Sequence, residues 1–295
     1  MTPRIGTRLL WGGAYLKEGW YATRRTIRGG GPPDLLIVGA QKAGTTSLFN
    51  YLCATPGFSG SQRKEVRFFS HDGRYRRGTA WYERFFHGRG RGMRFEATPE
   101  YLYRPDVPAR IHAHYPNVRI VMVLREPVSR AYSAWNMYRR WAERGFMPLA
   151  MWQERASNPL YSLFFTGSPP SFEEYVAHEM QLLKSIEPPP EPGILRRGIY
   201  ADQLSRYLRY FDFNQVLVLG FSELAESPKQ TIGRVVAFAK SDAPGRTKGT
   251  RHYPLPHNTG HYRARAPDPI AARLRDFYAP HNERLWSLLG RSVHW

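Results

Sequence analysis

A strand, a glycine-bounded loop and a helix N-terminus follow one another between residues 34 and 52, and this stretch constrains the fold most. Residues 35–38 form a continuous apolar run, which is typical of a strand buried on both faces of a parallel sheet. Gly39 and Gly44 bound the loop, and the segment from Thr45 has the apolar spacing of a helix. Such a loop points backbone N–H groups at an anion, and the helix dipole adds to the attraction. The stretch therefore predicts a phosphate-binding site.

The position of the lysine separates this loop from the P-loops of nucleoside triphosphatases. Those loops read G-x-x-x-x-G-K-[ST], with the lysine directly after the second glycine. Here Thr45 holds that position and the lysine is Lys42, three residues earlier. No Asp suited to holding Mg²⁺ follows a later predicted strand. We therefore expect Lys42 to reach the bridging oxygen of a bound anhydride without a metal; the alternative is a glycine-rich turn with an exposed lysine.

Other apolar runs alternate with helical patterns along the chain. The sequence predicts further strands at 93–97, 118–124 and 215–220. It predicts helices at 79–86, 106–115, 127–144, 171–186, 200–211, 228–240 and 268–289. Residues 56–62 and 242–267 read as loops. This alternation favours an α/β, P-loop-like three-layer fold with a central, mostly parallel sheet flanked by helices.

We expect two regions, a basic N-terminal lead-in segment at 1–33 and one domain at 34–295. The proline-rich stretch at 187–193 is not taken as a boundary, because the strand at 215–220 is needed to complete the sheet. The lead-in has no hydrophobic region of a secretory signal, and no run of about 18 apolar residues exists in the chain. These features predict a cytoplasmic protein. The lead-in itself fits a docking arm, a disordered leader or a basic amphipathic segment in peripheral contact with a membrane.

The charge balance is strongly basic. The 295 residues carry 43 Lys and Arg against 24 Asp and Glu, a net charge of +19. Such a field attracts nucleic acid, anionic polysaccharide or lipid headgroups, and charge alone does not choose among them. The ten histidines are scattered without metal-ligand spacing, so no metal is expected. The one cysteine, Cys53, excludes an intramolecular disulfide, and we expect its thiol to be buried.

The loop QKAGTTSL at 41–48 resembles the 5′-phosphosulfate loop of sulfotransferases that use 3′-phosphoadenosine 5′-phosphosulfate (PAPS). Within that family the chain looks most like the carbohydrate branch that includes the sulfotransferase domain of heparan N-deacetylase/N-sulfotransferase. Matching segments follow in the same order. They are KEVRFF (64–69), FEATPEYL (95–102), VLREPVSRAYSAW (123–135), GIYADQLSRYLRYFDFNQVLVL (198–219) and LRDFYAPHNERLWSLLG (274–290). The resemblance covers nearly everything after Asp34.

The resemblance implies the donor site. PAPS is the expected donor and adenosine 3′,5′-bisphosphate (PAP) the product, without a metal. The loop residues implied in donor binding are Gln41, Lys42, Ala43, Gly44, Thr45, Thr46 and Ser47. Lys42 matches the lysine that neutralises charge on the leaving oxygen. Arg125 and Ser133 resemble the clamp for the 3′-phosphate, although an ion pair of Arg125 with Glu126 or Glu96 is the alternative.

The acceptor side is implied by KEVRFF. Glu65 matches the proposed general base, which takes the proton of the attacking hydroxyl or amine, while a surface Glu paired with Lys64 or Arg67 is the alternative reading. Lys64 and Arg67 are candidate substrate-binding residues. Relatives often have His where this chain has Arg67, so Arg67 either contacts an anionic acceptor or tunes Glu65. A nearby cation would depress the pKa of Glu65 and keep it ionised.

Two further positions depart from the family pattern. Relatives often have a Lys-Gly-Arg segment that closes over the donor, and here Thr259, Gly260 and His261 stand there, with Arg263 or Arg265 as candidate replacements. Many relatives carry Lys where this chain has Ala97, so one acceptor-side cation is missing.

The function predicted is transfer of a sulfuryl group from PAPS to a hydroxyl or amine of a carbohydrate-type acceptor by in-line displacement. Anionic acceptors are among those considered, and nucleic acid is not expected as a partner. The alternatives are a P-loop kinase for small molecules and a basic nucleic-acid-binding protein.

Overall fold

The computed structural model describes residues 30–86, 92–145, 163–184, 193–241 and 265–295. Most of the lead-in, and all but the last three residues of the predicted 242–267 loop, lie outside these ranges. Within them, no helix combines the length and apolarity needed to cross a membrane.

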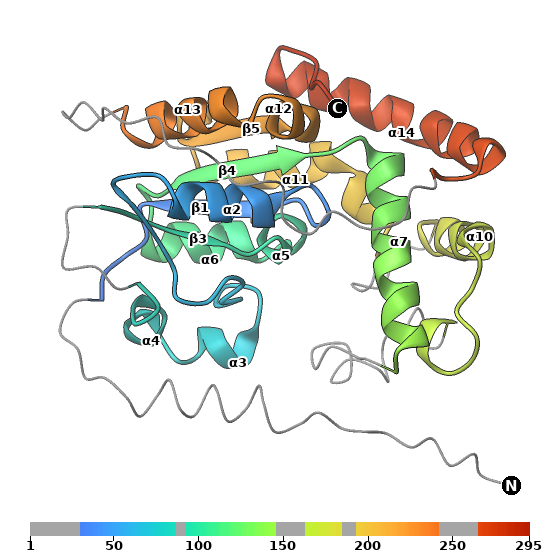
Figure 1. Cartoon of the computed structure of the whole chain (residues 1–295), viewed down its shortest axis with the longest axis horizontal. Coiled ribbons are helices and arrows are strands. Elements are labelled where there is room, and N and C mark those ends of the chain that lie inside the picture. The colour runs from blue at the N-terminus through green and yellow to red at the C-terminus, as the bar shows by residue number, and fades with distance from the viewer. Residues whose placement is uncertain (1–29, 87–91, 146–162, 185–192, 242–264) are drawn as a thin grey trace, which may run out of the picture.

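A five-stranded parallel sheet forms the centre of the molecule, as predicted (Figure 1). The strands are β1 (Leu35–Gly39), β2 (Phe58–Gly60), β3 (Met93–Ala97), β4 (Arg119–Leu124) and β5 (Val216–Gly220). Their order is β2-β3-β1-β4-β5, and every pair is parallel. All five residues of β1 are buried, since β1 is the central strand and helices cover both faces. The carboxyl ends of β3, β1 and β4 therefore meet at one edge of the sheet.

The predicted helices are present with ends shifted by a few residues. They are α2 (Thr45–Cys53), α4 (Thr79–Glu83), α6 (Val107–His114), α7 (Pro127–Glu143), α10 (Phe172–Leu182), α11 (Tyr200–Leu208), α13 (Pro228–Ala239) and α14 (Asp268–Leu289). The chain moves from β1 outward to β3 and then crosses back to β4. Right-handed crossovers in opposite directions place helices on opposite faces. Accordingly α2 packs with α13, whereas α5 packs with α11.

The elements that the sequence analysis missed are short. They are β2, α3 (Asp72–Tyr75), α5 (Glu100–Tyr103), α12 (Phe221–Glu226) and two 3₁₀ turns, η1 (Arg196–Gly198) and η2 (Phe213–Gln215). β2 falls in the segment predicted to be a loop at 56–62. It is an edge strand of three residues that pairs with β3 from Phe58 opposite Met93. Segments of three to six residues are too short to show a periodicity.

The prediction of a buried Cys53 thiol was wrong. Cys53 is the last residue of α2 and is exposed to solvent. The apolar face of α2 is carried by Leu48, Phe49 and Leu52, which are buried. Cys53 is four residues after Phe49, so it lies at the edge of that face, at the C-terminal end of the helix.

A second apolar cluster beside the sheet fixes the position of α7. The residues that form it come mainly from α7, α10, α14 and the segment just before η1, and they include Tyr138, Tyr175 and Leu274. Buried Glu179 of α10 accepts hydrogen bonds from Tyr175 Oη at 2.6 Å and from Leu195 N at 2.8 Å. Figure 1 shows α7 and α10 side by side, with α14 close to the start of α7. α7 is thus held by packing along its length, next to the carboxyl end of β4.

The N-terminus of α7 supplies a stability prediction. The Glu126 carboxylate accepts from Val128 N at 2.9 Å and from Ser129 N at 2.7 Å, and Pro127 occupies the first turn. Glu126→Ala leaves both amides unpaired and should lower the free energy of unfolding by about 1 kcal/mol. The melting temperature should fall by roughly 2–4 °C, measured by calorimetry.

Glu126→Asp is the matched control, because Asp is itself a favoured N-cap residue and should retain most of the stability. Equal melting temperatures for the wild type and Glu126→Ala would show that the cap contributes nothing.

Candidate active site

The loop between β1 and α2 forms the predicted cradle. Ala40 N donates to Val123 O at 2.7 Å, which ties the loop to β4. Gly44 is the N-cap of α2 and has φ 85°, a conformation that glycine adopts without strain. A Cβ at Gly44 would lie 3.1 Å from the Phe221 ring, so space also restricts this position. The first turn of α2 leaves backbone N–H groups without intrahelical partners, which is what an anion requires.

The side chains of the cradle differ in accessibility. Ala43, Thr45 and Ser47 are buried, whereas Gln41 and Thr46 are partly exposed. The hydroxyl most available to a ligand is therefore that of Thr46. The loop does bring all its predicted donor-binding residues to the carboxyl end of β1.

Lys42 lies among other charged groups of the site. Burial is the largest cause that lowers the pKa of Lys42, and the charges of Arg140 and Arg125 lower it further, to about 8. Glu65 acts in the opposite direction, because its carboxylate favours the protonated amine. Two predicted residues far apart in sequence, Lys42 and Glu65, thus share one site. The exposed lysine considered as the alternative is not what the structure shows, since Lys42 is half-buried.

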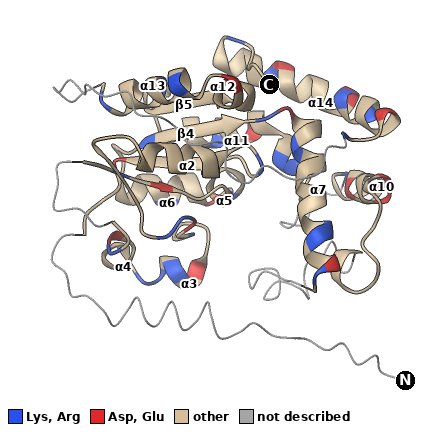
Figure 2. Cartoon of the chain, in the orientation of Figure 1, with Lys and Arg blue, Asp and Glu red and all other residues tan. Residues whose placement is uncertain are grey.

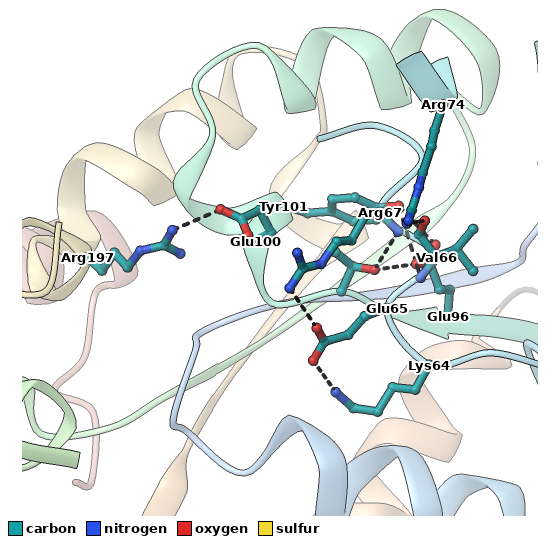
Figure 3. A network of polar contacts seen from close by, with 10 residues as sticks. Lys64, Glu65, Val66, Arg67, Arg74, Glu96, Glu100, Tyr101 and Arg197 are labelled. Carbon is teal, nitrogen blue, oxygen red and sulfur yellow. Dashed lines mark hydrogen bonds and ion pairs between the residues drawn. The ribbon is translucent and has the colours of Figure 1, made fainter. Parts of the chain in front are cut away.

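Glu65 is held by the two cations that flank it in sequence. Its Oε1 lies 2.8 Å from Lys64 Nζ and its Oε2 lies 3.3 Å from Arg67 Nη2 (Figure 3). Burial opposes ionisation, but the charges and hydrogen bonds of Lys64 and Arg67 outweigh it and hold the pKa of Glu65 below its ordinary value. Glu65 is therefore a carboxylate at neutral pH. The ion pairs of Glu65 with Lys64 and Arg67, which were the alternative interpretation, are present, and they lower the pKa of the same carboxyl group.

Backbone strain concentrates in this site. Among the residues that the structure describes, three residues other than glycine have positive φ: Lys42 at 68°, Glu65 at 63° and Arg67 at 55°. A left-handed conformation costs a residue with a Cβ on the order of 1–3 kcal/mol, and it persists only where surrounding contacts enforce it. All three had been predicted to be site residues from the resemblance.

Arg125 follows β4 and contacts the cradle directly. Its Nη1 donates to Lys42 O at 3.2 Å, and its guanidinium lies 4.7 Å from the centre of the Phe221 ring. Tyr200 Oη donates to Arg125 O at 2.8 Å. Glu126 caps α7, and Glu96 lies in a separate buried network, so both alternative partners have functions elsewhere.

Ser133 is on α7, two turns after the end of β4, and is buried. The structure thus places it on the helix that leaves the Arg125 end of β4, as predicted, although its side chain is largely covered.

Sequence reasoning missed Arg140 and the pair Glu100–Arg197. Arg140 is seven residues after Ser133, two helical turns, so the spacing that selected Ser133 would also have selected Arg140. Arg197 Nη2 lies 2.8 Å from Glu100 Oε1, and its guanidinium lies 4.1 Å from the centre of the Tyr103 ring. Burial opposes ionisation of Glu100, but Arg197 and then Arg67 keep its pKa low. No pattern in the sequence pointed to this pair.

Several predicted residues do not meet the site in the described ranges. Thr259, Gly260, His261 and Arg263 lie outside them, and Arg265 is exposed. Ala97 is fully buried at the end of β3, so the position where relatives carry Lys faces the protein interior here. In the described part of the chain no three His, Cys, Asp or Glu residues come together as a metal site.

The chain matches the model of the sulfotransferase domain over residues 32–248. It is 28% identical to the human heparan sulfate glucosamine 3-O-sulfotransferase 6, in an alignment that covers 89% of this chain and 73% of that protein. It is 27% identical to the mouse heparan sulfate glucosamine 3-O-sulfotransferase 3B1, over 89% of this chain and 65% of that protein.

A crystal structure of a sulfotransferase from Alicyclobacillus acidocaldarius is similar as well. It has a TM-score of 0.64 and 28% sequence identity, over 89% of this chain and 98% of that one. The sequence match and the parallel sheet with its cradle agree on one assignment: the chain belongs to the sulfotransferase family and is a sulfotransferase.

Proposed function

We propose that this protein transfers a sulfuryl group from PAPS to a hydroxyl or amine of an anionic carbohydrate. The observation that carries the proposal is that Lys42, in the cradle before α2, and Glu65 are near enough for the Glu65 charge to raise the pKa of Lys42. In-line transfer needs a cation at the leaving oxygen and a base at the attacking atom, and these residues are of those two kinds. The family supplies the donor class, PAPS, with PAP as the product.

The residues present fit this donor. The N-terminus of α2 and the Thr46 hydroxyl suit the 5′-phosphate, and Arg125 suits the 3′-phosphate, with Ser133 behind it on α7. Arg125 lies against both Lys42 O and the Phe221 ring, so its guanidinium is already oriented in the free protein. A preorganised fork of this kind binds phosphate without first losing side-chain freedom.

The reaction divides between two sides of the site. Glu65 accepts the proton of the attacking hydroxyl or amine while the new bond to sulfur forms. Lys42 stabilises the negative charge on the oxygen that keeps the electron pair as its bond to sulfur breaks. Because the transition state of such a transfer is loose, positioning and electrostatics contribute most of the catalysis.

The charges around Glu65 favour an anionic acceptor. Lys64 and Arg67 border it directly, and Arg140 acts on Lys42 from α7. Figure 2 shows further basic residues on α3 and on the C-terminal half of α7. The heparan sulfate named for the relatives is an acceptor of this charge class, and a carbohydrate acceptor is therefore the first to test.

Three other predictions stay proposals. They are the cytoplasmic location, the peripheral membrane contact of residues 1–33 and the division at residue 34. The roles in donor binding of Thr259, Gly260, His261 and Arg263 are proposals as well.

The proposed function predicts both a ligand and a product. PAP should raise the melting temperature more than AMP or ATP with Mg²⁺, because only PAP carries the 3′-phosphate; at a hundred times Kd the stabilisation is about 2.7 kcal/mol. In Arg125→Ala, PAP and AMP should stabilise equally.

Mass spectrometry should show sulfation of anionic polysaccharides after incubation with labelled PAPS. If the protein sulfates a lipid or a small alcohol but no polysaccharide, the proposed acceptor class is wrong and the proposed sulfuryl transfer stands.

A second prediction concerns the pH dependence of Lys42. Since the pKa of Lys42 is lowered to about 8, its protonated fraction falls as pH rises through that value. The rate constant kcat/KM, which reports the free enzyme, should fall about tenfold per pH unit above it. Arg140→Gln removes a charge that lowers this pKa and should shift the alkaline limb to higher pH.

Lys42→Ala should lower turnover by roughly a hundredfold or more and keep the wild-type far-ultraviolet spectrum. An alkaline limb that stays in place in Arg140→Gln, or near-normal turnover in Lys42→Ala, would remove Lys42 from the mechanism.

A third prediction separates the base from the donor site. Glu65→Gln removes the proton acceptor but keeps the size of the side chain, so kcat should fall roughly 10²- to 10⁴-fold. The affinity for PAP, measured by calorimetry, should stay near the wild-type value. Loss of PAP affinity in Glu65→Gln would contradict an acceptor-side role.

A further inference from the structure

The segment that carries Glu65 has a backbone that needs outside support. Glu65 and Arg67 are both left-handed, with Val66 between them. Neither is a glycine, so contacts elsewhere must hold this conformation. The direction in which the Glu65 carboxylate points depends on those contacts.

The support comes from the end of β3 and the start of α5. Glu65 N donates to Ala97 O at 3.0 Å, and Val66 N donates to Glu96 Oε1 at 3.0 Å. Arg67 N donates to Thr98 Oγ1 at 3.3 Å. Three consecutive amides are thus bound by three consecutive residues some thirty positions later in the chain. Figure 3 shows Glu96 next to Val66, with the Glu65 carboxylate directed away from them toward Lys64 and Arg67.

Glu96 is the centre of this support. It is fully buried, and Tyr82 Oη donates to its Oε2 at 2.5 Å. The Thr98 hydroxyl donates to its Oε1, and Tyr101 Oη lies 3.2 Å from Oε2. The residue that supports the Arg67 amide is therefore itself fixed by Glu96. The carboxylate joins Val66 and Thr98 in one hydrogen-bond network.

A buried carboxylate is a costly way to fill a core position. Ionised groups lose much hydration free energy on burial, and apolar side chains of similar volume often stabilise a fold as well. Glu96 has instead the one property that an apolar residue lacks, which is several acceptor sites with fixed directions. Its position one residue past the middle of β3 points those acceptors at the backbone of Val66.

We propose that Glu96 is a positioning residue for sulfuryl transfer, and that with Thr98 it holds the left-handed backbone that directs Glu65 at the reacting centre. The inference rests on the proposed function, because it assigns Glu65 the part of base. Glu96 acts through Val66 N and Thr98 Oγ1. It is not a group that contacts the donor or the acceptor.

The first test uses variants of nearly equal size. Glu96→Gln and Thr98→Val should each lower kcat roughly ten- to hundredfold, the size of effect that a small misplacement of a catalytic group produces. Thr98→Ser keeps the hydroxyl and should restore most of the rate. The affinity for PAP and the KM for PAPS should remain within about twofold of wild type, since the cradle is untouched.

The second measurement is the acid limb of the pH profile. The pKa of Glu65 is held low by Lys64 and Arg67, so a displaced segment weakens these contacts and raises that pKa. The acid limb of kcat/KM should therefore move to higher pH in Glu96→Gln and in Thr98→Val. A residue that only fills the core would lower stability without moving this limb.

Glu179→Gln is the matched control. Glu179 is as buried as Glu96 and also accepts from a tyrosine and backbone amides, but in the cluster of α7, α10 and α14. Its variant should lose a similar amount of stability and keep the wild-type acid limb and kcat.

The outcomes separate the two claims. If the wild-type protein transfers sulfuryl groups and the Glu96→Gln and Thr98→Val variants keep kcat and the acid limb, the positioning role is wrong and the proposed function stands. A kcat loss in Glu179→Gln equal to that in Glu96→Gln would overturn it too. Wild-type protein that binds no PAP and sulfates no acceptor would overturn the proposed function and this inference with it.

Discussion

Parallel pairing of β3, β1 and β4 is the interaction on which the rest of the site depends. Because the three strands run the same way, their carboxyl ends lie together, and each one continues into a different part of the site. β1 leads into the cradle with Lys42, β3 leads into the residues that hold the Glu65 segment, and β4 leads to Arg125. The hydrogen bond from Ala40 N to Val123 O links two of these exits directly. Sheet pairing thus sets the spacing between the donor side and the acceptor side.

The free protein holds charges of one sign close together at these exits. Burial is the largest cause that disfavours the protonated form of Lys42, and the charges of Arg140 and Arg125 add to it. An anionic donor reverses the balance, since it offers each cation a partner. Around Glu65 the charges are instead complementary, because the two cations Lys64 and Arg67 lie beside one carboxylate. The site is therefore strained electrostatically before it binds its donor, which is a common cost of preorganised sites.

The fold was easier to predict from the sequence than the candidate site. The apolar runs of β1 and β4 are continuous because both strands are buried on both faces, and such runs are visible without a structure. The three-residue β2 gave no such run. Glu65 could be selected only through the resemblance, because nothing local distinguishes it from a surface carboxylate. Glu96 was considered only as a partner of Arg125, because its backbone partner, Val66 N, lies thirty residues earlier and residue types do not reveal backbone conformation.

The contact of Phe221 with both Gly44 and Arg125 has a consequence for the order in which the protein matures. Phe221 begins α12, directly after β5, almost 180 residues beyond the cradle that it borders. A nascent chain on the ribosome completes β1, the cradle, α2 and the Arg125 strand long before this aromatic wall is synthesised. The cradle therefore reaches its final form only at a late stage of synthesis, and a fragment that ends before β5 lacks the aromatic ring that borders Gly44 and Arg125.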